Sequence, residues 1–461
     1  MRVLEADLTY INGKFESGVG VEIDDVSGRI TRVAPAESLG DERFRLRARA
    51  LMPGFINAHS HSFQRIIRGR TQWRPPRNAP SDFWSWRDEM YSAALTLTAD
   101  DIYDVSRLCF LEMLLAGITT VGEFHYLQRD ESGTTYGDPL ELHKCVLQAA
   151  ADVGIRIVLL NTAYVTGGVG AQLRWTQRRF NTPDLAKFLS TCDDLKSAAT
   201  RYRNATVGMA PHSVRAVPRD WLKPLAEWAR INNVPLHMHI SEQLAEVEAC
   251  AAAFGLRPVE LLAAEGVLDG RVTAVHATHT SAHEIALLAR ARATVCACPS
   301  TERDLGDGFL PASSLHAAGV RMAIGSDSQT VIDPLTEIRS VEYHERLRRL
   351  ERVVLGTALE DRIAVAPTLL RMGTQGGAAS LQIHSGAIES GRDADLITID
   401  LQDVSLAGYT AETLDNFIAL SAQPATIRDI WVGGRQVVAE RQHKNASDIT
   451  MRYRQVAERL W

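Results

Sequence analysis

The segment LMPGFINAHSH (residues 51–61) is the first of the apolar runs from which the fold can be predicted. An apolar run leads into His59 and His61, and because residues two apart on a strand point to the same side, both imidazoles can face one place. Seven similar runs follow, at 118–126, 155–164, 205–213, 234–242, 271–279, 293–300 and 320–328. Near-continuous apolar runs are typical of parallel strands buried on both faces, and amphipathic helical stretches separate most of them. Residues 51–384 are therefore predicted to form a (β/α)8 TIM barrel of the α/β class.

The two ends of the chain have a different texture, with short strand-like segments joined by tight turns. Asn12-Gly13 and Gly433-Gly434 are the turn pairs that such hairpins favour. Because chain termini often lie close together, we expect residues 1–50 and 385–461 to form one small composite β-domain, β-sandwich-like in kind.

Two segments match no regular element. Residues 71–90 (TQWRPPRNAPSDFWSWRDEM) are rich in proline and tryptophan and follow the first barrel strand directly. This position predicts an active-site loop or lid, with a packed surface loop or dimer loop as the alternative. Residues 167–183 form a second irregular region, whose role is open.

Composition excludes several classes of function. The chain has 50 Lys+Arg against 56 Asp+Glu, a formal net charge of −6, which argues against partners such as nucleic acid or an anionic membrane surface. Six cysteines in 461 residues do not suggest a disulfide framework. The chain lacks the basic and apolar start of a signal peptide and any apolar run of about 20 residues. We therefore expect a cytoplasmic protein.

Histidines gather where the barrel strands are expected to end, which is where barrels of this kind hold their functional groups. The fifth run ends with His237, His239 and Glu242, the sixth includes His276, and the eighth includes Asp327. A single buried histidine is usually a core residue. Several histidines and an aspartate on successive strand ends instead predict a divalent-cation site with an open position for water.

The motifs PGFINAHSH, HMHISE, the His276 strand and GSDS resemble the amidohydrolase superfamily, in particular its deaminase branch with one metal ion. The resemblance covers nearly the whole chain and implies His59, His61, His239 and Asp327 as metal ligands, with His237 structural. Chemistry then suggests the roles of the remaining groups. Asp327 can take a proton from the metal-activated water, His276 can orient that water, and Glu242 can protonate the substrate nitrogen and the leaving amine.

Five further residues are placed to reach the barrel mouth and bear on the substrate: Gln64, Arg87, Tyr126, His212 and Arg215. Arginine offers a planar fork that binds carboxylates with two parallel hydrogen bonds. Two arginines in the pocket of an acidic protein therefore predict a dicarboxylate substrate. The alternative for either arginine is a salt bridge to a neighbouring acid.

Longer segments resemble one family within this branch, the deiminases that act on N-formimino-L-glutamate in histidine catabolism. These segments are HSHSFQR, FWSWRDEMY, EFHY, APHSVR, HMHISEQ and CPSTERDLGDG. The resemblance implies zinc, hydrolysis to N-formyl-L-glutamate and ammonia, and a homodimer. It places Arg87 and Arg215 on the two carboxylates, and Gln64, Tyr126 and His212 on the rest of the substrate. One residue departs from the family pattern: Asp304 stands where asparagine is expected, which bears on substrate preference.

Two other functions stay open. A guanine- or cytosine-type nucleobase deaminase could use the same barrel, although it would have no reason for two arginines at the mouth. A catalytically dead barrel that only binds a ligand would be expected to lack part of the metal set or Glu242. Cys296 and Cys298, on the seventh run, are interpreted as packing residues rather than as competing thiol ligands.

Overall fold

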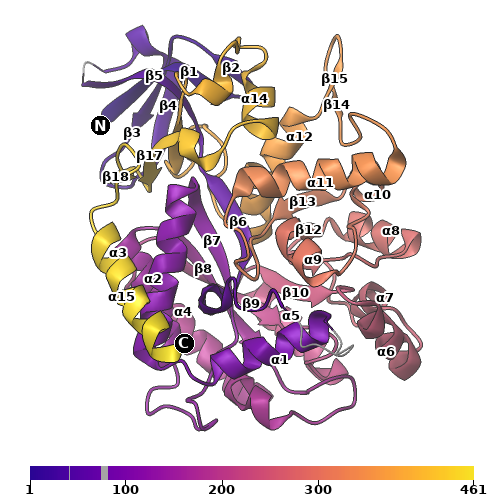
Figure 1. Cartoon of the computed structure of the whole chain (residues 1–461). Helices are drawn as coiled ribbons and strands as arrows, with labels where there is room; N and C mark the ends of the chain where they lie inside the picture. The colour runs from indigo at the N-terminus through magenta and orange to yellow at the C-terminus, as the bar shows by residue number, and fades with distance from the viewer. Residues whose placement is uncertain (41, 74–80) are drawn as a thin grey trace.

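The computed structural model describes residues 1–40, 42–73 and 81–461. Its centre is an eight-stranded sheet in which each strand pairs with the next along the chain, from β6 to β13 (Figure 1). These strands are β6 (Phe55–Ser60), β7 (Ile118–His125), β8 (Arg156–Ala163), β9 (Ala205–Pro211), β10 (Leu236–Ile240), β11 (Val272–His276), β12 (Thr294–Ala297) and β13 (Arg321–Ile324). All their pairings are parallel. The predicted (β/α)8 barrel is confirmed.

The barrel closes where its first and last strands meet, at residues that the sequence marks as functional. The backbone N–H of His61 donates to the carbonyl of Asp327 at 3.1 Å, and the N–H of Asp327 donates to the carbonyl of His59 at 3.0 Å. Ser60 and Asp327 form a parallel bridge there. The closure therefore brings the ends of β6 and β13 together.

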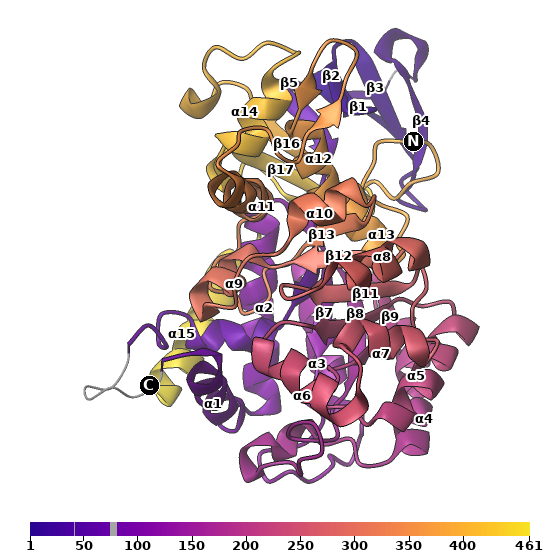
Figure 2. The ribbon, with the colours of Figure 1, turned by 90° about the vertical axis from the view of Figure 1, so that its right-hand side faces the viewer.

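Helices lie outside the barrel strands, as Figure 2 shows for α4 to α8. The α-helices of the described residues are α1 (Phe83–Ala94), α2 (Ala99–Leu115), α3 (Glu141–Val153), α4 (Leu185–Ala199), α5 (Arg219–Ile231), α6 (Leu244–Phe254), α7 (Pro258–Ala264), α8 (Ala282–Ala291), α9 (Pro299–Leu305), α10 (Ala312–Ala317), α11 (Pro334–Arg349), α12 (Ala366–Arg371), α13 (Gly377–Leu381), α14 (Leu414–Leu420) and α15 (Ala446–Leu460). Helix α5 buries Trp221, Leu225 and Trp228 on one side, the apolar face expected of a helix that covers a barrel.

Strands from both ends of the chain form a second sheet, as predicted. Its order is β18-β17-β16-β5-β1-β3-β4, with β2 paired to β1. The strands are β1 (Arg2–Ile11), β2 (Lys14–Glu16), β3 (Val19–Ile23), β4 (Ile30–Pro35), β5 (Arg43–Pro53), β16 (Leu396–Asp400), β17 (Ile427–Val432) and β18 (Arg435–Val438). A separate apolar core that includes Leu4, Ile23 and Trp431 packs in this small domain. A two-stranded hairpin, β14 (Thr357–Ala358) with β15 (Ile363–Ala364), lies apart from both sheets.

The chain passes from the small sheet to the barrel at Gly54, between β5 and β6. A side chain there would meet Thr119 at 2.2 Å, so only glycine fits this crossing without displacement of β7. At the other end, α15 packs on α2 of the barrel, where Arg107 donates to Asp448 at 2.7 Å. The last helix of the segment 385–461 therefore lies on the barrel rather than on the small sheet (Figure 1).

The prediction that residues 71–90 contain no regular element is wrong for their second half. Residues from Phe83 onward belong to α1, which Asp82 caps by accepting the backbone N–H of Ser85 at 3.0 Å. The aspartate and serine form a reciprocal capping box, a helix-start signal that the aromatic residues obscured. Residues 74–80 of the proposed loop lie outside the described residues.

Among the described residues, no helix combines the length and the apolar composition that a membrane span requires. All six cysteines are free.

Substitution of Gly122 tests how tightly β7 packs against β6, the strand that carries His59. A side chain there would lie 2.5 Å from Leu381 Cδ2 and 2.6 Å from the carbonyl oxygen of Ala58. Because the second neighbour is backbone, we expect Gly122→Ala to lower the free energy of unfolding by roughly 1–3 kcal/mol. Urea denaturation measures this. The control is Gly137→Ala, which meets no atom within 4 Å; equal stability of the two variants would contradict the packing argument.

Candidate metal centre and active site

A pocket opens at the carboxyl ends of the barrel strands, where the sequence placed the functional groups. Of the residues expected at the site, those that line the pocket are His61, Gln64, Arg87, Tyr126, His212, Arg215, His239, Glu242 and Asp327. The remaining two, His59 and His276, are fully buried beside it. Helix α1 supplies one aromatic wall through Phe83, Trp86 and Tyr91.

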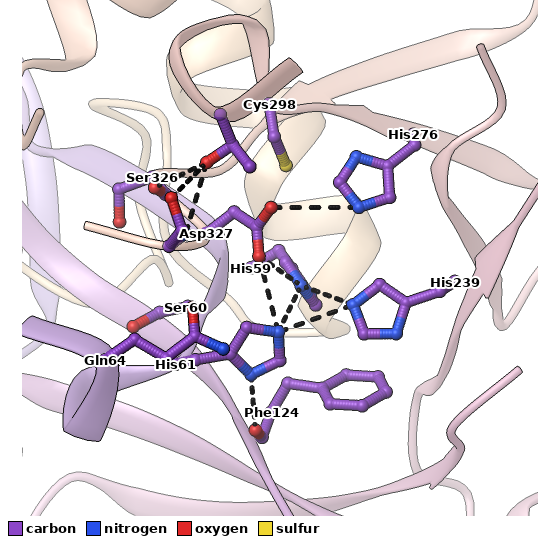
Figure 3. Close-up of polar contacts among 12 residues, drawn as sticks. His59, Ser60, His61, Gln64, Phe124, His239, His276, Cys298, Ser326 and Asp327 are labelled. Atoms are coloured by element: carbon purple, nitrogen blue, oxygen red, sulfur yellow. Dashed lines mark hydrogen bonds and ion pairs between the residues drawn. The ribbon is translucent and has the colours of Figure 1, made fainter. Parts of the chain in front are cut away.

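Three histidine nitrogens and one carboxylate oxygen surround a common point (Figure 3). The Nε2 atom of His59 lies 3.2 Å from that of His61 and 3.1 Å from that of His239, and the other two Nε2 atoms are 3.4 Å apart. Oδ1 of Asp327 lies 3.3 Å from Nε2 of both His59 and His61. All four side chains are buried.

These distances fit a small divalent ion. Ligand atoms about 2.0–2.1 Å from a tetrahedral centre, the range for zinc, stand roughly 3.3–3.4 Å from one another. The rings also have the required protonation, because burial and neighbouring histidines hold the pKa of His59 and His239 well below the usual value, and burial lowers the pKa of His61 to about 3. Neutral imidazole is the form that binds metal.

Backbone carbonyls hold two of the rings in place. Nδ1 of His61 donates to the carbonyl of Phe124 at 2.9 Å, and Nδ1 of His239 donates to the carbonyl of His212 at 3.1 Å. Such bonds fix the tautomer that leaves Nε2 free for a metal. His212, expected only near the substrate, thus also supports a ligand through its backbone. Asp327 itself has a left-handed backbone, φ 47°, as strained residues at functional sites often do.

A buried hydrogen-bond network beneath the ligands was missed from the sequence. Asn57 donates to Ser326 at 2.7 Å, Ser326 donates to Gln329 at 2.8 Å, Gln329 donates to Ser60 at 2.9 Å, and Ser60 donates to Glu123 at 2.6 Å. Burial raises the pKa of Glu123 to about 7. The network joins β6, β7 and the end of β13. Its sequence signal is limited to Asn57 and Ser60, two polar residues in the strand segment FINAHSH.

Glu242, His276 and Asp327 form an acid–base cluster beside the ligands. Nε2 of His276 lies 3.7 Å from Oε1 of Glu242 and 3.7 Å from Oδ2 of Asp327, and it has no hydrogen-bond partner among the described residues. Although burial disfavours the charged ring, Glu242, Asp327 and Glu302 together raise the pKa of His276 well above its usual value. Its Nδ1 faces Glu302 at 3.4 Å, a contact that sequence reasoning did not find.

The two arginines differ in their surroundings. Arg215 donates from Nη2 to Oε2 of Glu242 at 2.7 Å, and its Nε forms an ion pair with Oε2 of Glu246 at 3.1 Å. The alternative of a salt bridge to neighbouring acids therefore describes Arg215. Arg87 forms no ion pair within residues 1–40, 42–73 and 81–461; its guanidinium stands 4.5 Å from the ring centroid of Trp84.

Other predicted residues have the following places. Gln64 donates to the hydroxyl of Tyr126 at 2.8 Å, and its buried Oε1 has no partner in the described part of the chain. Asp304 lies at the rim, where it accepts from Gln72 at 2.7 Å, and it does not line the pocket. His237 faces the carbonyl of Ser380 at 3.0 Å, away from the metal set.

Comparison with known proteins defines the class. The amidohydrolase family model matches residues 50–437, so this chain belongs to the amidohydrolase family. It is 37% identical to the formimidoylglutamate deiminase of Pseudomonas aeruginosa over 396 residues, 86% of each chain. It is 27% identical to a 5-methylthioadenosine/S-adenosylhomocysteine deaminase of Thermodesulfovibrio yellowstonii, covering 86% of this chain and 82% of the other.

Solved structures show the same fold. An amidohydrolase from Brucella melitensis is 32% identical with a TM-score of 0.91, covering 100% of both chains. An adenosine deaminase from Xanthomonas campestris with bound zinc has a TM-score of 0.82 at 23% identity, covering 99% of this chain and 98% of that one. At this lower identity the likeness concerns the fold alone.

Removal of one ligand tests the metal centre. We expect the protein to bind about one divalent ion per chain and Asp327→Ala to lose most of it, because the variant lacks the only oxygen ligand of the set. Elemental analysis of dialysed protein measures the occupancy. Asp304→Ala, which removes a rim aspartate outside the set, is the matched control and should keep its metal. Full occupancy in Asp327→Ala would contradict the assignment.

Proposed function

We propose that this protein is a zinc-dependent deiminase that hydrolyses N-formimino-L-glutamate to N-formyl-L-glutamate and ammonia. The single observation that carries the proposal is the position of Arg87 in the pocket without an acidic partner among the described residues. A guanidinium lines the pocket of the metal centre without an acidic partner in the described ranges, and its buried Nε has no hydrogen bond there. Arg87 is half-buried, and a partly desolvated cation without an acidic partner favours a ligand that supplies an anion. The 37% identity to a formimidoylglutamate deiminase supports the same substrate.

The metal and its neighbours divide the chemistry. An ion held by His59, His61, His239 and Asp327 would lower the pKa of a water ligand toward ~7 and polarise the C=N group under attack. Asp327 has a second oxygen for proton transfer, because Oδ1 faces the histidine ligands whereas Oδ2 faces His276. Oδ2 can accept a proton from the attacking water. The unpartnered Nε2 of His276 can donate a hydrogen bond that orients the water oxygen.

Glu242 completes the reaction as the group that returns protons to nitrogen. Its Oε2 is fixed by Arg215, which leaves Oε1 on the side of His276 and the pocket. The water oxygen bonds to the formimino carbon while its two protons pass in turn to Glu242, one of them by way of Oδ2 of Asp327. Glu242 gives the first proton to the imino nitrogen and the second to the resulting amine, and the C–N bond to that amine breaks. Both water protons leave with ammonia, and the formyl group stays on the glutamate nitrogen.

A nucleobase or nucleoside deaminase is the second candidate. Relatives named as 5-methylthioadenosine/S-adenosylhomocysteine deaminases favour it at 27% identity, and the aromatic wall of Phe83, Trp86 and Tyr91 could stack on a base. Ammonia release from N-formimino-L-glutamate, measured beside guanine, cytosine and adenosine nucleosides, separates the candidates. Faster turnover of a neutral heterocycle would replace the proposed substrate. A protein that binds and does not turn over any of them would be a binding barrel.

The role of Glu242 predicts a specific defect. Glu242→Gln keeps an oxygen that can accept from Arg215 but cannot transfer a proton, so kcat should fall by roughly 10²–10⁴-fold while the metal remains. Steady-state kinetics with elemental analysis measures both. Glu248→Gln removes an exposed carboxylate nearby on α6 and should leave kcat unchanged. Near-normal kcat in metal-loaded Glu242→Gln protein would exclude the proton-transfer role.

The two arginines should respond differently to the same substitution. Arg87→Met should mainly raise KM for N-formimino-L-glutamate, lowering kcat/KM by roughly 10–100-fold, because a charge-assisted hydrogen bond is lost. Arg215→Met should also lower kcat, because it releases Glu242. Arg178→Met, which removes a guanidinium stacked on Trp175 outside the pocket, is the control. Unchanged KM in Arg87→Met would contradict its contact with the substrate.

A further inference from the structure

Two tyrosines beside Arg87 have no part in the chemistry described so far. Tyr91 of α1 and Tyr164, which follows β8, both line the pocket and are 2% and 3% exposed. Their hydroxyl oxygens lie 3.0 Å apart. They come from segments 73 residues apart in the chain, and sequence patterns gave no reason to pair them.

Gln177, which is fully buried, sets the polarity of this pair. Its Oε1 accepts the backbone N–H of Arg174 at 2.9 Å, and because a backbone N–H can only donate, the orientation of the amide is fixed. The other end, Nε2, therefore donates to the hydroxyl oxygens of Tyr91 at 3.0 Å and Tyr164 at 2.7 Å. Both phenol oxygens act as acceptors toward Gln177.

One of the two phenol O–H hydrogens of Tyr91 and Tyr164 has no acceptor among the described residues. The two phenols have two O–H hydrogens, and the contact between Tyr91 and Tyr164 uses one. Gln177 cannot accept the other, because its amide nitrogen faces both oxygens. Neither hydroxyl has a further partner in residues 1–40, 42–73 and 81–461. One O–H hydrogen thus remains for a ligand in the pocket.

The surroundings favour an anionic acceptor for that hydrogen. The guanidinium of Arg87 stands 5.4 Å from the ring centroid of Tyr91, so a ligand anion bound by this cation comes close to the tyrosine pair. Burial raises the pKa of Tyr164 well above its usual value, even though Arg87 and Arg215 oppose the shift. The phenol therefore keeps its hydrogen at neutral pH and acts as a neutral donor.

We propose that the Tyr91–Tyr164 pair donates a hydrogen bond to the substrate carboxylate that Arg87 binds, and that Gln177 is the positioning residue that keeps this donor pointing outward. The identity of the substrate rests on the proposed function. The pair would distinguish a carboxylate from its amide, because both oxygens of a carboxylate accept, whereas an amide has one acceptor oxygen and must turn its NH2 group toward either Arg87 or the tyrosine donor. The class of ligand recognised is a carboxylate anion.

The first test inverts the polarity of the positioning residue. Gln177→Glu keeps the shape of the side chain but replaces Nε2 with an oxygen, which accepts hydrogens from the phenols instead of donating to them. We expect the Kd of N-formyl-L-glutamate, the product of the proposed reaction, to rise roughly 10–100-fold. Calorimetry on the metal-loaded protein measures it, and kinetics should show a rise in KM larger than any fall in kcat.

The second variant does not depend on a buried charge. Tyr91→Phe combined with Tyr164→Phe removes both hydroxyls and should weaken the same ligand by a similar factor. N-formyl-L-glutamine and N-formyl-L-isoglutamine each block one of the two carboxylates. We expect the double variant to lose affinity for only one of these amides, the one that leaves the Arg87-bound carboxylate free. Arg87→Met should lose affinity for the same amide and not for the other.

Tyr103→Phe is the matched control, because its hydroxyl bonds Asp152 outside the pocket, and it should leave every Kd unchanged. Unchanged affinity for N-formyl-L-glutamate in both test variants would overturn the inference. Equal losses for both amides would also overturn it, since a general packing defect would act on both ends of the ligand. A wild-type protein that hydrolyses N-formimino-L-glutamate while the variants bind normally refutes this inference alone. A wild-type protein that neither hydrolyses it nor binds the product refutes the proposed function as well.

Discussion

The closure of the barrel and the assembly of the metal centre depend on the same contacts. Two backbone hydrogen bonds join β6 to the end of β13, and the residues that make them are His59, His61 and Asp327. These bonds bring ligands from the first and last strands to within 3.3 Å of each other. The network from Asn57 through Ser326 then ties the two strands together by side chains. A barrel that failed to close would therefore have no ligand set.

Burial shifts the pKa values of the ionisable groups around the metal site. The same exclusion of water that lowers the pKa of the ligand histidines raises that of Glu123 to about 7. Neutral imidazoles and one carboxylate are a ligand combination suited to a divalent cation rather than to protons. His276 is the exception, since three carboxylates outweigh its burial. One buried site thus holds imidazole ligands whose pKa is lowered beside a histidine whose pKa is raised.

The sequence predicted what depends on periodicity and missed what depends on tertiary contact. Apolar runs and strand-end histidines predicted the barrel and the residues that the structure brings together, because strand direction alone fixes where His59 and His61 point. The helix that begins at Phe83 was missed because aromatic residues hid its capping signal. Glu246, Tyr164 and Gln177 carry no local pattern; their roles come from partners distant in the chain. The left-handed backbone at Asp327 has no sequence signal either, since most aspartates do not adopt that conformation.

The arginines show why residue type alone could not settle how the substrate is bound. Sequence reasoning treated Arg87 and Arg215 as equivalent, one for each carboxylate. In the structure the charge of Arg215 is already compensated by Glu242 and Glu246, whereas Arg87 rests on aromatic rings. An incoming anion therefore gains most at Arg87, where it replaces no existing partner. At Arg215 an anion would share the guanidinium with Glu242, so in the proposed function the contact that recognises substrate there would also place the proton donor. The proposed function would therefore separate substrate recognition from proton transfer at Arg87 and join the two at Arg215.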